Sequence, residues 1–278
     1  MRNIWSQPWG SLRLLLVALA TWPCASLAQS PTPAPAGGLL VSPTYVLFDG
    51  RERSKALLLT NRGDAPEIYR ISIIDRRQMP DGQLAATDQP GPGEGFASRL
   101  VRYAPREVLL QPNKPQTIRV LLQLPADLPD GEYRSHILVQ QVPKASEPPP
   151  PDKPEGLSVT IKAIFGVSVP VIIRKGQLDA TASLSDVHAL RLPDGRSAVG
   201  LRLNRAGTRS LRGDLSVLVD GAPAGQLNNF NVFLSTPYRE LTIPLTTPGD
   251  LKGHRVAVEF NEGENVPSPA SAKETLTP

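Results

Sequence analysis

The sequence contains a single cysteine, Cys24, which lies near the N-terminus together with all three tryptophans. The chain beyond residue 28 therefore cannot form an internal disulfide, and packed cores have to supply its stability. Histidine is also scarce, since His136, His188 and His254 are the only three and lie far apart in the sequence. No pair of these histidines has metal-ligand spacing, so we expect neither a bound metal nor a cofactor.

Signatures of catalysis and of nucleic-acid binding are missing as well. The sequence has no Gly-rich phosphate loop ahead of a helix and no Gly-x-Ser-x-Gly nucleophile elbow. Lys and Arg number 30 against 26 Asp and Glu, a near balance that gives no sign of a nucleic-acid partner. No long apolar segment follows the N-terminal one, so we expect no membrane insertion. These absences argue against an enzyme and favour a protein that binds another polypeptide.

The N-terminus has the pattern of a secretory signal. Two arginines supply positive charge, residues 12–19 form a short apolar run, and residues 26–28 offer small side chains at the two positions that signal peptidase inspects. The run is too short to span a bilayer, which needs roughly 20 apolar residues. We therefore expect a signal peptide over residues 1–28 and export to the periplasm. Lipid attachment at Cys24 is the alternative.

The remaining chain, about 250 residues, is long enough for two domains. Residues 29–38 are rich in Pro and Ala and are expected to form a flexible lead-in. Beyond them, short runs with β-branched and aromatic residues alternate with Asp-Gly pairs, which favour tight turns. This pattern predicts an all-β protein with two β-sandwich domains in tandem, at residues 39–175 and 176–262.

Three segments interrupt this rhythm. Residues 79–95 are polar and rich in Pro and Gly, which predicts a long loop between strands. Residues 143–156 include four consecutive prolines, which lack the N–H group that a sheet requires. Residues 263–278 lack an apolar pattern and are predicted to form a disordered tail.

The most informative stretch is a long predicted strand at residues 157–173. Its odd positions are all apolar, which places one unbroken apolar stripe on a single face of the strand. The residues of this stripe are Leu157, Val159, Ile161, Ala163, Phe165, Val167, Val169 and Val171. A strand of this length has more apolar side chains than one sandwich core should use, and such an edge can add itself to the sheet of a partner. The alternative is that the whole stripe faces the core of its own domain.

Several motifs, taken in chain order, resemble the PapD-like periplasmic chaperones of the chaperone–usher pathway. The resemblance covers residues 39–176 and is looser over residues 177–261. The segments that carry it are Val46-Leu47-Phe48-Asp49-Gly50, residues 57–61 with Gly63-Asp64, Tyr103-Ala104-Pro105-Arg106, Leu110-Gln111-Pro112, residues 116–120, Gly131-Glu132-Tyr133-Arg134-Ser135-His136 and Ile172-Ile173-Arg174.

The resemblance implies two immunoglobulin-like domains and a chaperone that caps fimbrial (pilin) subunits by lending them a strand, before delivery to an outer-membrane usher. The subunit-binding residues implied are Leu157, Val159, Ile161, Ala163, Phe165, Val167 and Val169. An exposed stripe of this kind is rarely left bare, so self-capping by a second copy is plausible. The alternative function is a structural β-sandwich adhesin or another pilus-associated component without chaperone activity.

The sequence departs from the family at the residues that hold the terminal carboxylate of the subunit. Family members usually use an arginine in the first strand and a lysine in the donor strand, and these positions correspond here to Tyr45 and Pro170. The resemblance therefore implies that carboxylate binding is lost or is moved to neighbouring residues, because an arginine fork suits a carboxylate well. The candidates for contacts in this cleft are Arg174, Lys175, Arg134, Arg119 and Tyr45.

Overall fold

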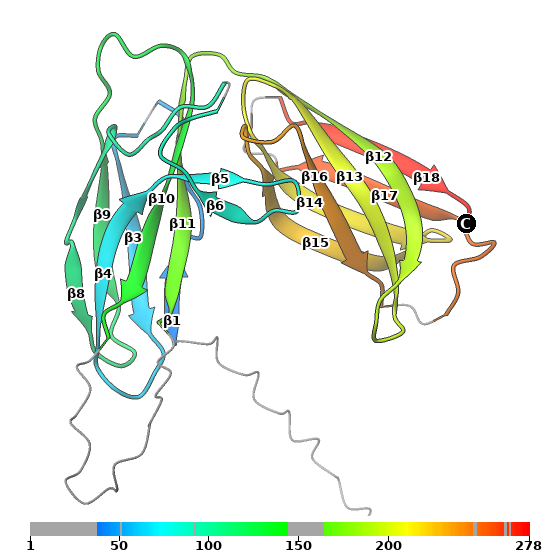
Figure 1. The fold of residues 1–278 in the computed structure, drawn as a ribbon, viewed down its shortest axis with the longest axis horizontal. Helices are drawn as coiled ribbons and strands as arrows, with labels where there is room; N and C mark the ends of the chain where they lie inside the picture. The colour runs from blue at the N-terminus through cyan, green and yellow to red at the C-terminus, as the bar shows by residue number, and fades with distance from the viewer. Residues whose placement is uncertain are drawn as a thin grey trace, which may run out of the picture. The chain divides into compact units, whose positions relative to one another are not determined.

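The computed structural model describes residues 38–278 except 51, 92, 144–163, 247–248, 264–265 and 267. Residues Pro35–Pro278 form one compact unit. The described residues contain β-strands and no helix (Figure 1), which confirms the predicted all-β class.

The first sandwich consists of two sheets. One has the strand order β1–β3–β9–β7 and the other has the order β2–β11–β10–β4–β8. The strands of the first sheet are β1 (Leu39–Ser42), β3 (Ser54–Asn61), β9 (Gln116–Leu122) and β7 (Val101–Ala104). Those of the second are β2 (Val46–Phe48), β11 (Gly166–Lys175), β10 (Gly131–Gln141), β4 (Glu67–Ile74) and β8 (Glu107–Leu110). This order matches an immunoglobulin sandwich, in which strands A, B, E and D face strands C, F and G.

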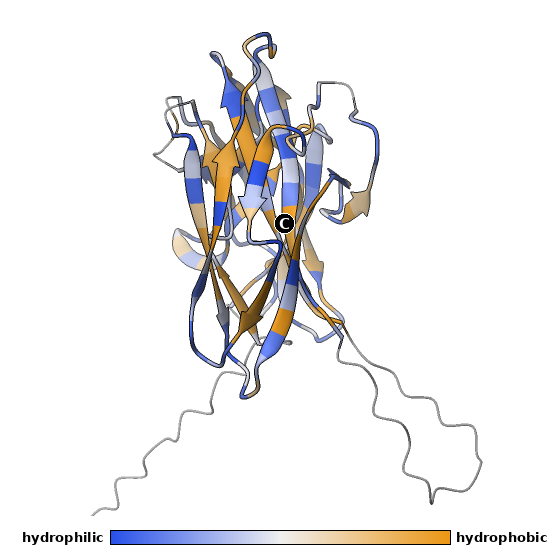
Figure 2. Cartoon of the chain, turned by 90° about the vertical axis from the view of Figure 1, so that its left-hand side faces the viewer, coloured by the Kyte–Doolittle hydropathy of each residue, from blue (hydrophilic) through white to orange (hydrophobic). Residues whose placement is uncertain are grey.

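Alternating side chains build the core between these sheets. In β9, for example, Ile118, Val120 and Leu122 are buried while the residues between them are exposed. Phe48 from β2 and Ile137 from β10 are fully buried in the same core. Figure 2 shows apolar and polar residues alternating along the strands, as expected for sheets with one face in a core.

The N-terminal strand of this sandwich is divided between the two sheets. β1 pairs antiparallel with β3, whereas β2 pairs parallel with β11. The chain therefore changes sheets between Ser42 and Val46. Among the described strands, only the short β2 pairs with β11 on the side opposite β10.

The second sandwich has the strand orders β12–β13–β16 and β15–β14–β17–β18 in the described residues. The strands are β12 (Ala180–Arg191), β13 (Ser197–Gly207), β16 (Tyr238–Pro244), β15 (Ala222–Val232), β14 (Leu211–Val219), β17 (Val256–Glu262) and β18 (Ser271–Leu276). A separate core, which includes Val217, Ile243 and Phe260, lies between the two sheets. The prediction of two immunoglobulin-like sandwiches in tandem is therefore confirmed.

The prediction of a disordered tail at residues 263–278 is wrong, because β18 pairs antiparallel with β17 along its whole length. The predicted end of the second domain at residue 262 is therefore too early. Ala272 and Leu276 pack against the second core, and Glu262 accepts a hydrogen bond from Ala270 N at 2.9 Å. The backbone ladder holds this polar segment, although its side chains give only a weak apolar pattern.

The predicted long loop at residues 79–95 also needs correction. It contains β6 (Leu84–Ala86), which pairs antiparallel with β5 (Arg76–Gln78) to form a hairpin. Gly82 lies in the turn with φ +88°, a conformation that glycine adopts without strain. The turn signal was present in the sequence, but the two strands are too short to show an apolar alternation.

Candidate functional site

One edge of β11 is only partly covered. β11 pairs with β10 from Gly166 to Lys175, whereas β2 pairs with it only at Val171–Ile173. Within the part of the chain that the structure describes, no strand pairs with Gly166–Pro170 on the other side. Pro170 carries no N–H group, a feature that sheets tolerate at edges. The first half of β11 is therefore an open edge, where the backbone of another segment could pair.

Along the described part of the apolar stripe, the side chains become more exposed toward the N-terminus of the strand. Val169 is 1% exposed, Val167 is partly buried against the same core, and Phe165 is 38% exposed. The ladder continues past the start of β11, because Gln141 N donates to Phe165 O at 2.9 Å. The described part of the stripe is thus shared: Val169 belongs to the core of its own sandwich, and exposure increases from there through Val167 to Phe165.

Four of the seven predicted subunit-binding residues lie outside the described residues: Leu157, Val159, Ile161 and Ala163. The predicted strand at residues 157–173 begins at Gly166 in the described part of the chain. The assignment of the whole stripe to subunit binding therefore stays a prediction.

A cavity of about 510 Å³ lies beside β2 and β11, and both sandwiches contribute to its lining. The first sandwich supplies Tyr45, Lys55 and Arg174, and the second supplies Arg212 and Asn229. Its volume is within the range of small-molecule sites. Its lining combines these cationic and neutral polar groups with three carboxylates, Asp49, Asp214 and Glu262.

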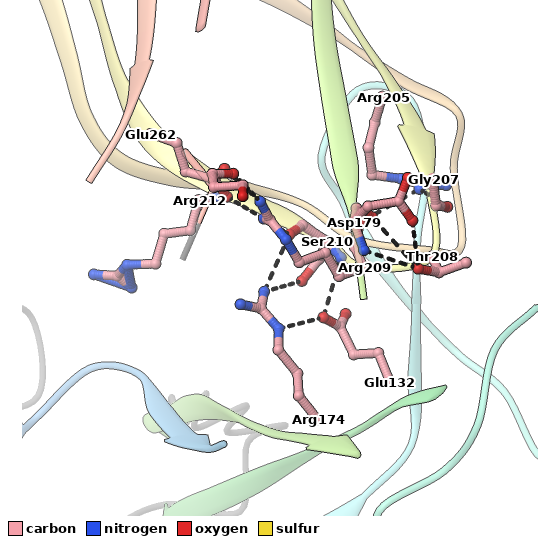
Figure 3. A network of polar contacts seen from close by, with 11 residues as sticks. Glu132, Arg174, Asp179, Arg205, Gly207, Thr208, Arg209, Ser210, Arg212 and Glu262 are labelled. Carbon is pink, nitrogen blue, oxygen red and sulfur yellow. Dashed lines mark hydrogen bonds and ion pairs between the residues drawn. The ribbon is translucent and has the colours of Figure 1, made fainter. Parts of the chain in front are cut away.

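Arg174 is held in this cavity by contacts to both sandwiches (Figure 3). Its Nε donates to Glu132 Oε2 at 2.9 Å, and its Nη2 donates to Ser210 O at 3.1 Å. Burial lowers the pKa of Arg174, but the charge of Glu132 and the hydrogen bond to it outweigh burial and raise that pKa above its usual value. Arg174 therefore remains a cation, fixed in orientation, at the wall of the cavity.

Tyr45 and Arg212 stack on each other in the same cavity. The Arg212 guanidinium carbon lies 4.2 Å from the centre of the Tyr45 ring, and Arg212 Nη2 donates to Asn229 Oδ1 at 2.8 Å. Burial raises the pKa of Tyr45 to about 12, against the opposing effect of Arg174. The phenol therefore stays protonated at neutral pH and can donate a hydrogen bond. Two guanidinium groups and a phenol donor together suit an oxyanion such as a carboxylate.

The other predicted cleft residues do not line this cavity. Lys175 donates to Leu128 O and lies 3.8 Å from Asp130. Arg134 is buried, forms an ion pair with Glu94 at 3.0 Å and stacks on Phe233. Arg119 is exposed on β9, in the opposite sheet of the first sandwich. The structure thus brings together only Tyr45 and Arg174 of the five candidates.

Sequence reasoning missed Arg212, Lys55 and Asn229. Arg212 and Asn229 belong to the second sandwich, where the motif resemblance is loose, and no spacing in the sequence links them to Tyr45. Lys55 lies at the start of β3, and an isolated lysine at a strand end is most often solvated. One feature of the sequence could have pointed to Arg212. It is a charged residue within the alternating strand β14, at a position that is partly buried.

The described residues provide neither a metal site nor a membrane-spanning helix. They contain no group of three or more His, Cys, Asp or Glu residues that could hold a metal ion. They also contain no helix with the length and apolar character needed to cross a membrane.

No protein-family model matches the sequence, and no curated protein matches it. Solved structures are similar to it at low identity. The YadV chaperone is 13% identical with a TM-score of 0.45, and the match covers 86% of this chain and 100% of that one. The Pseudomonas aeruginosa CupB2 chaperone is 16% identical with a TM-score of 0.43, over 85% and 100% of the two chains.

A third similar structure is the CsuC–CsuE chaperone–tip adhesion subunit complex of the archaic chaperone-usher Csu pili of Acinetobacter baumannii. It is 13% identical with a TM-score of 0.46, over 84% of this chain and 97% of that one. The first two of these structures are of chaperones, and the third is of a chaperone in complex with a tip adhesion subunit.

Proposed function

We propose that this chain is a periplasmic chaperone that caps fimbrial (pilin) subunits by strand addition and then delivers them to an outer-membrane usher. The observation that carries the proposal is the open edge of β11 at Gly166–Pro170, together with the increasing exposure of the stripe toward Phe165. An edge with unpaired backbone groups and apolar side chains is a template for another strand.

Backbone and side chains have separate roles in this proposal. The free N–H and C=O groups of β11 form hydrogen bonds with the subunit, and the apolar side chains fill pockets in it. The side chains assigned to the subunit are Leu157, Val159, Ile161, Ala163 and Phe165. Each of the four larger side chains contributes roughly 1.5–3 kcal/mol if it becomes fully buried, and the methyl group of Ala163 contributes less. Val167 and Val169 anchor the donated strand in its own sandwich, because they already pack in that core.

The cavity beside β2 is assigned to the terminal carboxylate of the subunit. Arg174 and Arg212 supply positive charge, and Tyr45 supplies a neutral donor in place of the family's first-strand arginine. An arginine fork binds both oxygens of a carboxylate, and its charge is retained at every physiological pH. This arrangement fixes the end of the subunit chain and sets the register in which it pairs with β11.

Co-expression with a fimbrial subunit and recovery of the complex from the periplasm test the proposal. Phe165→Asp should abolish recovery of the subunit, while circular dichroism and the melting temperature of the variant remain those of the wild type. Ser168→Asp is the matched control, because Ser168 is exposed on the other face of the same strand. Normal recovery with Phe165→Asp would contradict the assignment.

The same variant separates the proposal from the alternative of a structural adhesin. If the stripe serves only its own core, a charge at position 165 is buried without a partner and should unfold the protein. Loss of the folded state with Phe165→Asp would therefore favour the structural function. Sedimentation of the free wild-type protein tests self-capping, because a dimer that dissociates when the subunit binds is expected.

A further inference from the structure

The side chain of Gln78, at the end of β5, is buried against the second sandwich. Gln78 is 4% exposed, whereas glutamine is mostly found at the surface. Its Oε1 accepts a hydrogen bond from Phe233 N at 2.9 Å, and its Nε2 donates to Asn231 O at 3.3 Å. Its backbone N donates to Ser235 Oγ at 3.0 Å. Gln78 thus directs three hydrogen bonds at one short segment of the other sandwich.

The two side-chain hydrogen bonds of Gln78 reproduce the hydrogen-bond pattern of a paired β-strand. A residue on a parallel strand donates to one residue of its neighbour and accepts from the residue two positions later. The amide of Gln78 makes this pattern with Asn231 and Phe233, on either side of Val232. β15 is an edge strand that ends at Val232 and pairs on its other side with β14. The amide therefore occupies the open edge of β15 as a single added residue would.

The turn of the β5–β6 hairpin makes two further contacts with the second sandwich. Glu240 N donates to Pro80 O at 2.8 Å, which joins the hairpin turn to β16. The guanidinium of Arg239 packs directly on Gly82, where an added Cβ would lie 2.0 Å from Nη2. The hairpin therefore contacts both β15 and β16 of the second sandwich, and a side chain at residue 82 would displace the Arg239 guanidinium.

Residues of β10 meet the same segment from the body of the first sandwich. The Arg134 guanidinium carbon lies 4.2 Å from the centre of the Phe233 ring, and its Nη2 reaches Ser235 Oγ at 3.4 Å. The ring of His136 contacts Phe233 edge-on, with centroids 6.1 Å apart. Phe233 is 3% exposed. The segment from Asn231 to Ser235 is thus enclosed by the hairpin and by β10.

We propose that Gln78 and the β5–β6 hairpin form a clamp that holds the second sandwich in a fixed position against the first. The second contact between the sandwiches joins Arg174 and Glu132 to Ser210, and Arg174 lies just before the linker between β11 and β12. One contact beside a linker still allows the two sandwiches to rotate relative to each other. A second contact at a separate place prevents that rotation. Because the cavity beside Tyr45 is lined by both sandwiches, the clamp also keeps that cavity assembled before any ligand arrives.

Distance measurement between the sandwiches in the isolated protein tests the clamp without reference to a ligand. In a Cys24→Ser background, Thr117→Cys and Lys252→Cys introduce spin labels at exposed sites, one in each sandwich. Double electron–electron resonance should give one narrow distance distribution for the wild type. Gln78→Met retains the size of the side chain and removes the amide, and it should broaden the distribution or add a second population.

Two further variants complete the experiment. Gln83→Met, at an exposed position in the same hairpin, is the matched control and should leave the distribution narrow. Ser235→Ala removes the hydroxyl group on the second sandwich that accepts the hydrogen bond from Gln78 N. This variant should broaden the distance distribution even if Gln78→Met fails to fold. Calorimetry should show the single unfolding transition of the wild type dividing into two in Gln78→Met. A narrow distribution in Ser235→Ala and in folded Gln78→Met would overturn the proposal, as would one transition that only moves to lower temperature.

Discussion

Glu132 and Arg174 form an ion pair across neighbouring strands, with 2.9 Å between Oε2 and Nε, and the same carboxylate oxygen accepts a hydrogen bond from Ser210 N at 3.0 Å. One oxygen of the first sandwich therefore binds both a guanidinium on its own sheet and the backbone of the second sandwich. The side chains are 1% and 12% exposed, so water screens this pair weakly.

Removal of the Glu132 carboxylate should lower the stability of the folded protein. Glu132→Ala leaves Arg174 as a buried cation without its partner and should lower the free energy of unfolding by about 3 kcal/mol. The exposed pair between Lys273 and Glu259 is the control, and Glu259→Ala should cost less than about 1 kcal/mol. Urea denaturation of both variants measures the difference. Equal effects would mean that the buried pair contributes no more than a surface one.

The exposure gradient along β11 predicts a gradient of stability. Val169→Ala removes two buried methyl groups from the core and should cost about 2 kcal/mol, because the vacated space can collapse only in part. Phe165→Ala removes a larger side chain but should cost less than about 1 kcal/mol, since that ring is 38% exposed. Thermal and chemical unfolding of both variants gives the comparison. A larger loss at Phe165 than at Val169 would place that ring in the core of the free protein.

The buried imidazole of His136 predicts an acid sensitivity. Burial, and then the charges of Arg134 and Arg76, lower its pKa from 6.5 to about 3. Between these values the unfolded chain binds a proton that the folded chain does not, so stability is complete above pH 6.5 and falls as the pH falls toward 3. His136→Leu should weaken this dependence in urea titrations at several pH values. His188→Leu, at an exposed position, should leave it unchanged.

The cavity assignment predicts a dependence on the terminal carboxylate. A peptide with the C-terminal sequence of a subunit should bind the wild type more tightly with a free carboxylate than with an amide. Arg212→Gln should weaken binding of the free-carboxylate peptide by about tenfold, the loss expected for one charge-assisted hydrogen bond, and should leave the amidated peptide unaffected. Calorimetric titration measures both, with Arg119→Gln as the control. Equal binding of the two peptides by the wild type would exclude carboxylate recognition at this site.

Alternation along a strand reports directly which face is buried, and it was enough to predict the all-β class and a strand that overlaps β11 at Gly166–Ile173. The resemblance named Tyr45 and Arg174 among five candidates for the cleft, but no spacing in the sequence linked these two residues. The role of Arg212 could not be predicted from the sequence. Its position beside Tyr45 depends on how the second sandwich packs, and no local sequence pattern encodes that contact.

The two errors at strand level have a common cause. β6 and β18 are held by backbone hydrogen bonds and by contacts at a few small side chains, of which Ala272 is one. Their polar side chains carry almost no periodic signal, so composition alone favours a loop or a tail. The same reasoning explains why Gln78 was missed, because its burial follows from the position of β15 and not from its neighbours in sequence.

The division of the first strand between two sheets decides how much of β11 remains open. β2 begins at Val46, opposite Val171, and the residues before it turn away to join β3 as β1. Pairing extended backward by three residues in the same register would bring Pro43–Tyr45 alongside Ser168–Pro170 and would cover most of the open edge. Pro43 has no N–H to offer such a ladder. Residues 43–45 are thus the part of the chain that could pair with this edge of β11. Because the chain changes sheets before Val46, the edge stays available to the strand of another protein.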